Sequence, residues 1–233
     1  MLSIGEIIEY AKACGLLNLL KVGIKGFVFL HMKRIVLSLS LEDPIPQPKA
    51  YQRFLRSITI RKATLADIAE LHRVMKQHKC WRSVRELREW MKKDCFLFIA
   101  IHKGKIVGYT CVCAEIPSSH SIFSKTIRLR PRDAYGVHAF VVPAYRGKMV
   151  YHALMMEICR CARAAGYRRI LATVDPLNRA ARSSHRRVGM KEIAELTVLK
   201  VLFFTWVKVH WVKPEAVDLF ARRVGIKAPS EGK

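Results

Sequence analysis

The stretch that most constrains the fold is residues 133–166, where a strand pattern changes directly into a helix pattern. Side chains alternate over residues 137–142 as in a strand, and Pro143, which has no N–H to donate, ends the ladder. A short basic turn follows at residues 144–148, and apolar residues then recur at helical spacing until Gly166. Such a unit predicts an anion site, because the free N–H groups and the positive dipole end of the helix point toward the loop.

The charge balance indicates which partners to expect. The chain has 42 Lys and Arg against 18 Asp and Glu, a formal net charge of +24. Such a field favours nucleotides, acidic carrier proteins, anionic lipids or nucleic acids, but does not specify a fold. A nucleic-acid or ribosome-associated role stays open as an alternative that we do not favour, because the sequence has no basic tail and no interleaved aromatic residues.

The cysteines and the first residues bear on compartment and cofactors. Seven cysteines occur without a CxxC pair, and no spacing fits a zinc site, so we expect no metal. We interpret them as reduced thiols that pack as small apolar groups in a cytoplasmic protein. Glu6 and Glu9 argue against a signal peptide, and lysines divide the first segment into apolar runs too short to span a membrane.

The composition divides the chain at a linker. Residues 1–33 have the pattern of an amphipathic helix with a basic polar side, broken near residues 23–26. This segment either packs on the main domain or a second subunit, as in a homodimer, or lies on an anionic membrane surface. Residues 34–41 alternate as a half-buried strand, and the proline-rich residues 42–48 form the linker. We therefore predict an extension over residues 1–48 and a main domain over residues 49–233.

The main domain alternates strands and helices. Thr64 or Asp67 is predicted to cap its first helix, and the sequence His102-Lys103-Gly104 predicts a hairpin turn. We expect strands at residues 58–61, 95–101, 105–113, 168–174, 195–199 and 202–212. We expect helices at residues 64–75, 83–92, 149–166, 178–189 and 214–224. The basic residues 117–132 are expected to form a loop, with the rim of a site for an anionic acceptor as the alternative. The core of the domain is expected at about residues 58–200, closed by a strand and helix over residues 201–228.

Residues 141–148 read V-x-P-x-x-R-G-K and resemble the strand and pyrophosphate loop of the GNAT acyl-CoA N-acyltransferase superfamily. The family loop reads Arg/Gln-x-x-Gly-x-Gly/Ala, and Arg146 matches its first position. Met149 stands where the first loop glycine belongs, and Tyr151 replaces the second small residue. These two larger side chains put the close approach of phosphate oxygens in doubt.

Two further segments carry the resemblance. Residues 60–71 read I-R-x-A-T-x-x-D-I-x-x-L, a wording with which the family often begins. Asn178, Ala181, His185 and Gly189 follow the family order of asparagine, small residue, aromatic and helix-closing glycine. The resemblance implies a mixed α/β (α+β) fold, with a central, mostly antiparallel sheet flanked by helices.

The resemblance also implies the reaction and the donor site. The expected reaction is transfer of the acetyl group from acetyl-CoA to a primary amine by direct attack, on an anionic or membrane-associated acceptor that the sequence does not identify. The backbone near Phe140 and Val141 would meet the thioester and pantetheine, and Asn178 would face the pantetheine arm or serve only as a helix N-cap. The loop residues expected to hold the pyrophosphate are Arg146, Gly147, Lys148, Met149, Val150 and Tyr151.

Two histidines are candidates for proton transfer. His185 occupies the place where the family often has a tyrosine that protonates the leaving thiolate, but it is equally explained as a packing histidine. His138 lies on the central strand where an amine would arrive and is a candidate base; a hydrogen-bonded core histidine or a water chain are the alternatives. No carboxylate lies in residues 135–142. A non-catalytic module with an altered CoA loop also remains open, because of Met149 and Tyr151.

Overall fold

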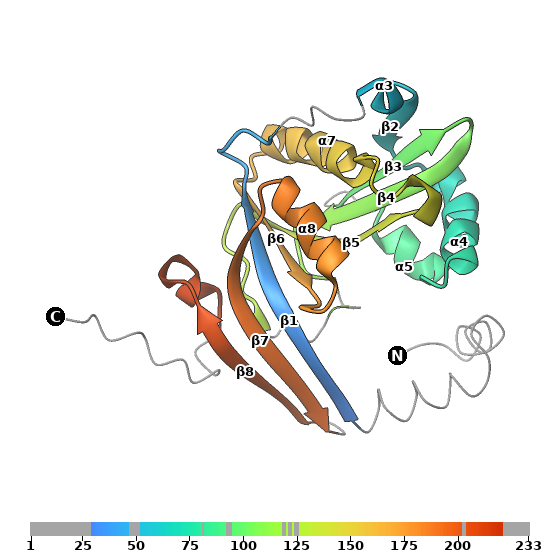
Figure 1. The fold of residues 1–233 in the computed structure, drawn as a ribbon. Helices are drawn as coiled ribbons and strands as arrows, with labels where there is room; N and C mark the ends of the chain where they lie inside the picture. The colour runs from blue at the N-terminus through green and yellow to red at the C-terminus, as the bar shows by residue number, and fades with distance from the viewer. Residues whose placement is uncertain are drawn as a thin grey trace.

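The computed structural model describes residues 29–46, 52–80, 82–91, 95–117, 120, 123, 126–201 and 204–220. They form one eight-stranded sheet in the order β2-β3-β4-β5-β6-β1-β7-β8, antiparallel except between β5 and β6 (Figure 1). The strands are β1 (Phe29–Ser40), β2 (Ile58–Lys62), β3 (Cys95–His102), β4 (Lys105–Cys113), β5 (Asp133–Val141), β6 (Arg169–Val174), β7 (Lys191–Val201) and β8 (Phe204–Val212). The predicted mixed α/β fold with a mostly antiparallel sheet is confirmed.

Helices cover both faces of this sheet (Figure 1). The α-helices are α3 (Gln52–Leu55), α4 (Ile68–Gln77), α5 (Val84–Glu89), α7 (Val150–Ala164) and α8 (Arg179–Arg187), and the 3-10 helices are η1 (Leu65–Asp67), η3 (Pro143–Tyr145) and η4 (Pro214–Leu219). The apolar side of α7, with Leu154 and Ile158, packs on one face together with α8. On the other face α4, α5 and η4 pack through Leu71, Leu87 and Leu219.

Strand β1 is an internal strand of the sheet. It pairs antiparallel with β6 on one side and with β7 on the other, and Val36 is fully buried. Residues 29–33 are therefore strand, and the prediction of helix up to residue 33 is wrong for them, because their backbone groups pair with β7. The rest of that predicted helix, residues 1–28, lies outside the described residues. The predicted boundary at residue 48 does not separate β1 from the sheet.

Local sequence signals predicted several element ends correctly. Thr64 and Asp67 form a capping box at η1, ahead of α4. The hairpin between β3 and β4 turns at Lys103 and Gly104, with φ of 50° and 73°. Gly189 follows the end of α8 with φ 97°, the left-handed conformation expected just after a helix.

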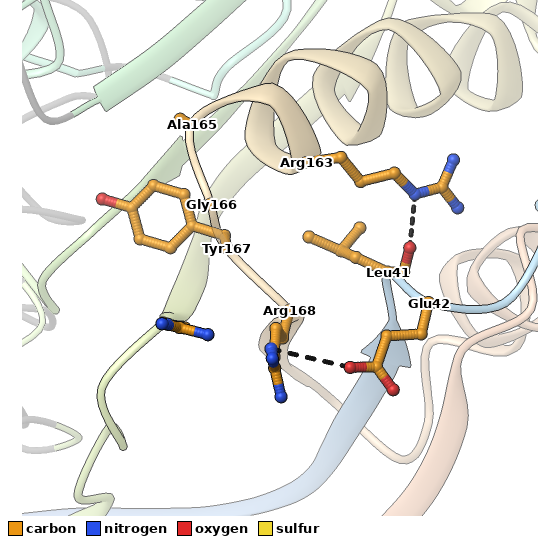
Figure 2. A pocket seen from close by; sticks show the side chains of 8 residues that line it. Leu41, Glu42, Arg163, Ala165, Gly166, Tyr167 and Arg168 are labelled. Atoms are coloured by element: carbon orange, nitrogen blue, oxygen red, sulfur yellow. Dashed lines mark hydrogen bonds and ion pairs between the residues drawn. The ribbon is translucent and has the colours of Figure 1, made fainter.

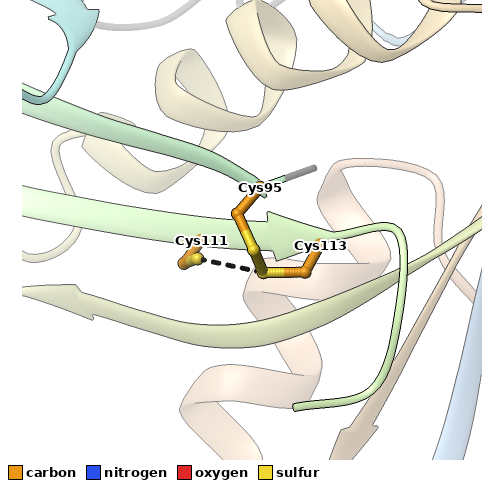
Figure 3. Close-up of a disulfide and its surroundings, with 3 residues drawn as sticks. All are labelled: Cys95, Cys111 and Cys113. Carbon is orange, nitrogen blue, oxygen red and sulfur yellow. Dashed lines mark hydrogen bonds between the residues drawn. A yellow bond between two sulfur atoms is a disulfide. The ribbon is translucent and has the colours of Figure 1, made fainter. Parts of the chain in front are cut away.

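Two expectations need correction. A disulfide joins Cys95 to Cys113, which face each other on β3 and β4, so these cysteines are not the reduced thiols that we expected (Figure 3). In the described part of the predicted helix at residues 214–224, the chain forms only the short 3-10 helix η4, and residues 221–224 lie outside the described residues. Helix η4 stops because Phe220 is extended and pairs with Ile127. In the part of the chain that the structure describes, no helix is long and apolar enough to cross a membrane.

Candidate functional site

The site is organised by the parallel strands β5 and β6. Their pairing covers only Asp133 to Gly136 on β5, whereas β5 continues to Val141. The second half of β5 thus runs on without β6, at the carboxyl ends of two parallel strands. Open α/β sheets bind ligands at that end, where neighbouring strands separate. Phe140 and Val141, which we predicted to meet the donor, lie on this half.

The predicted anion loop directly follows β5. It turns through η3, and α7 begins at Val150. The first hydrogen bond within the helix runs from the N–H of Ala153 to the carbonyl of Met149, at 3.0 Å. The N–H groups of residues 150–152 precede that bond, and the first turn of α7 carries no acidic residue. A helix end of this kind attracts an anion.

The loop has the backbone of a glycine-containing turn although only one glycine is present. Gly147 has φ 76°, and a Cβ added there would meet nothing within 4 Å. Met149 has φ 61° and ψ 16°, the left-handed conformation that a non-glycine residue adopts at a cost of roughly 1–2 kcal/mol. The position that departs from the family pattern therefore keeps the conformation that a glycine would supply.

The two cations of the loop are held against aromatic rings. The Arg146 guanidinium donates from Nε to the Val141 carbonyl at 3.1 Å and lies 5.8 Å from the centre of the Phe140 ring. Lys148 Nζ lies 5.4 Å from the centre of the Tyr145 ring. Both side chains thus add positive charge to a loop that ends at a helix N-terminus.

Three predicted site residues lie on or next to α8: Asn178 precedes it, His185 lies on it, and Tyr151 of α7 contacts it. Asn178 caps α8, and its Oδ1 accepts from the N–H of Ala181 at 3.0 Å, so the N-cap role is present. The Tyr151 hydroxyl and Nδ1 of His185 lie 2.9 Å apart, in a hydrogen bond whose direction depends on the imidazole tautomer. The two rings meet edge to face. Tyr151 therefore packs against the candidate acid.

His138 lies on the opposite face of the sheet, in an aromatic setting. Its Nδ1 is 2.9 Å from the Tyr109 hydroxyl, and its ring stacks on Tyr109 and on Trp90, with ring centres 5.6 and 5.8 Å away. The structure does not bring His138 and His185 together. His138 lies on β5 itself, whereas His185 lies on α8 and contacts Tyr151 of α7.

Both candidate histidines are half-buried, and this partial burial keeps them neutral near pH 7. It lowers the pKa of His138 to about 3, with a smaller contribution from the nearby positive charge of Arg82. It lowers the pKa of His185 to about 4. Burial also raises the pKa of the partner hydroxyls of Tyr109 and Tyr151, so both stay protonated near neutral pH. The site therefore offers neutral imidazoles, each beside a hydroxyl.

Three residues near His138 were missed by the sequence analysis. Tyr109 and Trp90 form its aromatic walls, and His120, with a pKa lowered by burial to about 4, packs against Tyr135. Among the described residues, Trp90 Nε1 and His120 Nδ1 are buried without a hydrogen-bond partner. Residues 105–113 were predicted to be a strand, but no pattern in the sequence indicated that Tyr109 would contact His138.

A sulfur cluster is the strongest metal candidate in the described part of the chain. The sulfur atoms of Cys95, Cys111 and Cys113 lie within 4.8 Å of one another, a donor set that suits soft metal ions. Two of them are joined as a disulfide, and only a thiolate is a good ligand. Our expectation that the protein needs no metal remains a prediction.

A hollow of about 570 Å³ lies at the other end of α7 (Figure 2). Arg163 and Arg168 line it. However, Arg163 donates a hydrogen bond to the Leu41 carbonyl, and Arg168 forms an ion pair with the Glu42 carboxylate. Because α7 separates this hollow from the loop at Arg146, we do not assign it to the donor site.

Comparisons with solved structures identify the fold. The chain is similar to a GCN5-related N-acetyltransferase from Sphaerobacter thermophilus, with a TM-score of 0.54, 16% identity and 79% of this chain covered. It is also similar to a Drosophila protein, with a TM-score of 0.52, 14% identity and 81% coverage. The chain spans 56% and 58% of the lengths of these two proteins.

A shorter match is the aminoglycoside N-acetyltransferase AAC(6')-Iy in complex with CoA, at 18% identity, a TM-score of 0.46, and coverage of 57% of this chain and 92% of that one. No curated protein sequence matches the chain.

The family assignment comes from the sequence. The family model described as "Acetyltransferase (GNAT) family" matches residues 63–190, more than half of the 233 residues. The matched range contains the strand β5, the loop at Arg146 and the helix α8. The resemblance noted from the sequence is thereby confirmed, and the chain belongs to the GNAT acetyltransferase family.

Proposed function

We propose that this protein is an acetyl-CoA-dependent N-acetyltransferase that transfers the acetyl group to a primary amine by direct attack. The observation that carries the proposal is the parting of β5 from β6 beside the loop that leads into α7. Family membership supports this reading. For the acceptor we propose only a chemical class: a primary amine that carries, or lies beside, negative charge.

The donor would bind between the loop and β5. The N–H groups at the start of α7 and the cations Arg146 and Lys148 would hold the pyrophosphate. Gly147 leaves open space beside its backbone, which would allow close approach. Backbone groups of Phe140 and Val141 would orient the thioester, whose carbonyl must be polarised for attack.

The acceptor amine would arrive at His138. A primary amine loses a proton as the new amide bond forms, while the thiolate of CoA leaves and takes up a proton. A neutral His138 can accept a hydrogen bond from the amine, but a pKa of about 3 makes it a weak base. We therefore assign it to orienting the amine and passing the proton to water. His185, with Tyr151 on its Nδ1, would donate a hydrogen bond to the leaving sulfur.

Titration calorimetry with acetyl-CoA tests the donor site. We expect micromolar binding by the natural chain and at least tenfold weaker binding by Arg146→Glu, since a cation at the phosphate is replaced by an anion. Arg85→Glu is a matched control, because it makes the same charge change on α5, where the side chain is 75% exposed. Equal binding by Arg146→Glu and the control would refute the loop as the pyrophosphate site.

Acceptor chemistry needs a second assay. Once acetyl-CoA binding has been measured, amines can be screened as acceptors by chromatographic detection of the free CoA that the reaction releases. The panel should include amines with and without a neighbouring anionic group. His138→Ala and His185→Ala should lower the turnover of any accepted amine while leaving the affinity for acetyl-CoA within a few fold. If both variants turn over as fast as the natural chain, the roles assigned to the histidines are wrong.

A non-catalytic module is the second candidate, and one observation favours it. The Tyr151 side chain, at a position where the family has a small residue, packs against His185 between α7 and α8. If it fills the path of the pantetheine, the fold would be kept without donor binding. Absence of binding at millimolar acetyl-CoA would support this reading, and Tyr151→Gly should then restore binding.

A further inference from the structure

The far end of the sheet, away from the candidate site, has an exposed aromatic surface. β1 begins there, and β7 turns into β8, so that Phe29, Val201 and Phe204 are cross-strand partners. Figure 1 shows these long strands extending side by side beyond the helices. Phe204 is 66% exposed and Trp206 is 53% exposed. Their rings stack with centres 5.8 Å apart, so they form one continuous apolar patch.

Cations lie directly behind this patch on the same face. Partners directly opposite each other in a sheet project to the same side. His210 shares the face, because its Nε2 is 2.7 Å from the Thr197 hydroxyl. Two cross-strand rows follow the tip: His31, Leu199 and Trp206, and then Lys33, Thr197 and Lys208.

The side chains of this surface are free to meet a partner. His31, Lys33, Lys208 and His210 are all exposed. The two rows contain no acidic residue, and the nearest carboxylate on this face, Glu195, accepts a hydrogen bond from the Trp211 indole at 3.1 Å. We name Phe204, Trp206, His31, Lys33, Lys208 and His210 the tip surface.

The opposite face of the same strands is already covered. Val198 is fully buried, and Val207 packs against the core cluster that contains α4 and α5. The alternation of β8 therefore directs its valines to the core and its large aromatic rings outward. A solvent-exposed strand face needs no stacked Phe and Trp, and exposed apolar patches of this kind mark interaction sites.

We propose that the tip surface docks the protein on an anionic lipid bilayer. Trp and Phe side chains favour the boundary between lipid and water, and a band of cations behind them would lie at the level of the phosphate groups. The order along the strands fits this: Phe204 lies at the tip, Trp206 and His31 share the next row, and Lys33 and Lys208 share the row after it. A purely electrostatic partner such as an acidic protein would not explain the exposed rings.

The sequence next to the tip supports a bilayer over the other possible occupants. The strand β1 is preceded by residues 1–28, a largely apolar segment whose charged residues are three lysines and two glutamates, and which therefore joins the sheet at this same end. A second copy of the chain would bring cations against cations, because the net charge is +24. An anionic surface, by contrast, is attracted by the band of cations.

Co-sedimentation with vesicles tests the proposal on the full chain. We expect binding to vesicles of phosphatidylcholine mixed with phosphatidylglycerol and at least tenfold weaker binding to phosphatidylcholine alone. The pair Phe204→Ser and Trp206→Ser should weaken binding to the mixed vesicles at least tenfold. Lys33→Glu and Lys208→Glu should each weaken it by about fivefold or more, and added salt should weaken it further. Leu65→Ser is the control, because it removes an apolar side chain that is 72% exposed but lies outside the tip surface. This variant should bind the mixed vesicles as well as the natural chain does.

A second readout does not depend on the folding of the serine variants. Brominated lipid should quench the tryptophan fluorescence of the natural chain, and Trp206→Phe, which keeps an aromatic ring, should lose most of that quenching. Unchanged sedimentation of the double serine variant would overturn the proposal and assign binding to another segment. The natural chain could instead fail to bind vesicles and form a dimer in solution that the double serine variant does not form. That result would overturn the bilayer proposal and assign the tip surface to contact with a second copy of the chain.

Discussion

Acidification from pH 7 to pH 5 tests the burial of the two candidate histidines. His138 and His185 have pKa values of about 3 and about 4, whereas a histidine in an unfolded chain has a pKa of about 6.5. As the pH falls below 6.5 the unfolded chain binds protons that the folded chain does not. The free energy of unfolding must therefore decrease, with most of the loss between pH 6.5 and pH 4.

The size of the loss follows from the pKa difference. Between pH 7 and pH 5, each of these histidines should lower the free energy of unfolding by about 2 kcal/mol. Ion-paired carboxylates whose pKa is lowered, such as Asp67, also lower the free energy of unfolding on acidification, but they do so at lower pH. The window from pH 7 to pH 5 therefore isolates the histidines from the carboxylates.

Urea unfolding at both pH values, followed by circular dichroism, measures this loss. His138→Asn and His185→Asn remove the titrating ring but keep a polar atom for Tyr109 and Tyr151. Each variant should be less stable at pH 7, because packing is lost, yet its loss between pH 7 and pH 5 should shrink by about 2 kcal/mol. His210→Asn, at an exposed position, serves as the control. If the loss on acidification is the same in both variants and in the natural chain, the burial argument is wrong.

Two further predictions concern the loop and the disulfide. Met149→Gly should raise the free energy of unfolding by up to about 1 kcal/mol and the melting temperature by about 2–4 °C, because glycine adopts φ 61° without strain. Met149→Ala keeps the Cβ and should show no gain; a gain in both would refute the backbone explanation. Cys95→Ser should cost roughly 3 kcal/mol, because the bond to Cys113 closes a loop of 18 residues. A reductant should lower the stability of the natural chain to that of Cys95→Ser. If Cys95→Ser is as stable as the oxidised natural chain, the disulfide is not present.

The parts of the fold that were predicted from the sequence depend on local chemistry. The cap of α4 needs only Thr64 and Asp67, and the turn between β3 and β4 needs only Lys103 and Gly104. The loop before α7 was identified because its residues are consecutive. Each of these signals lies within a few residues, so no knowledge of tertiary structure is required.

The parts that were not predicted depend on contacts between distant residues. Tyr109 and Trp90 meet His138 from separate elements, and no spacing in the sequence announces such a meeting. The pairing of Cys95 with Cys113 depends on the register of β3 against β4. The alternation of residues 34–41 indicated a strand, but alternation does not identify the neighbours of a strand.

The position of β1 connects the proposed donor site to the tip surface. From Ile35 to Ser40 this strand pairs with all of β6, whereas β5 pairs with only four residues of β6. Strand β6 therefore has a complete partner on its far side and stays in the sheet where its pairing with β5 ends, while β5 continues along β4. The parting that would hold the acetyl donor thus depends on β1.

The other half of the same strand leads to the tip surface. Residues 29–34 pair with β7 and carry His31 and Lys33 toward the exposed rings of β8. Because one continuous strand takes part in both places, the orientation of the site relative to a docked bilayer would be fixed by the sheet rather than by a flexible linker. If both proposals hold, the internal β1 strand would support both the donor site and the docking surface, because it pairs with β6 along one half and with β7 along the other.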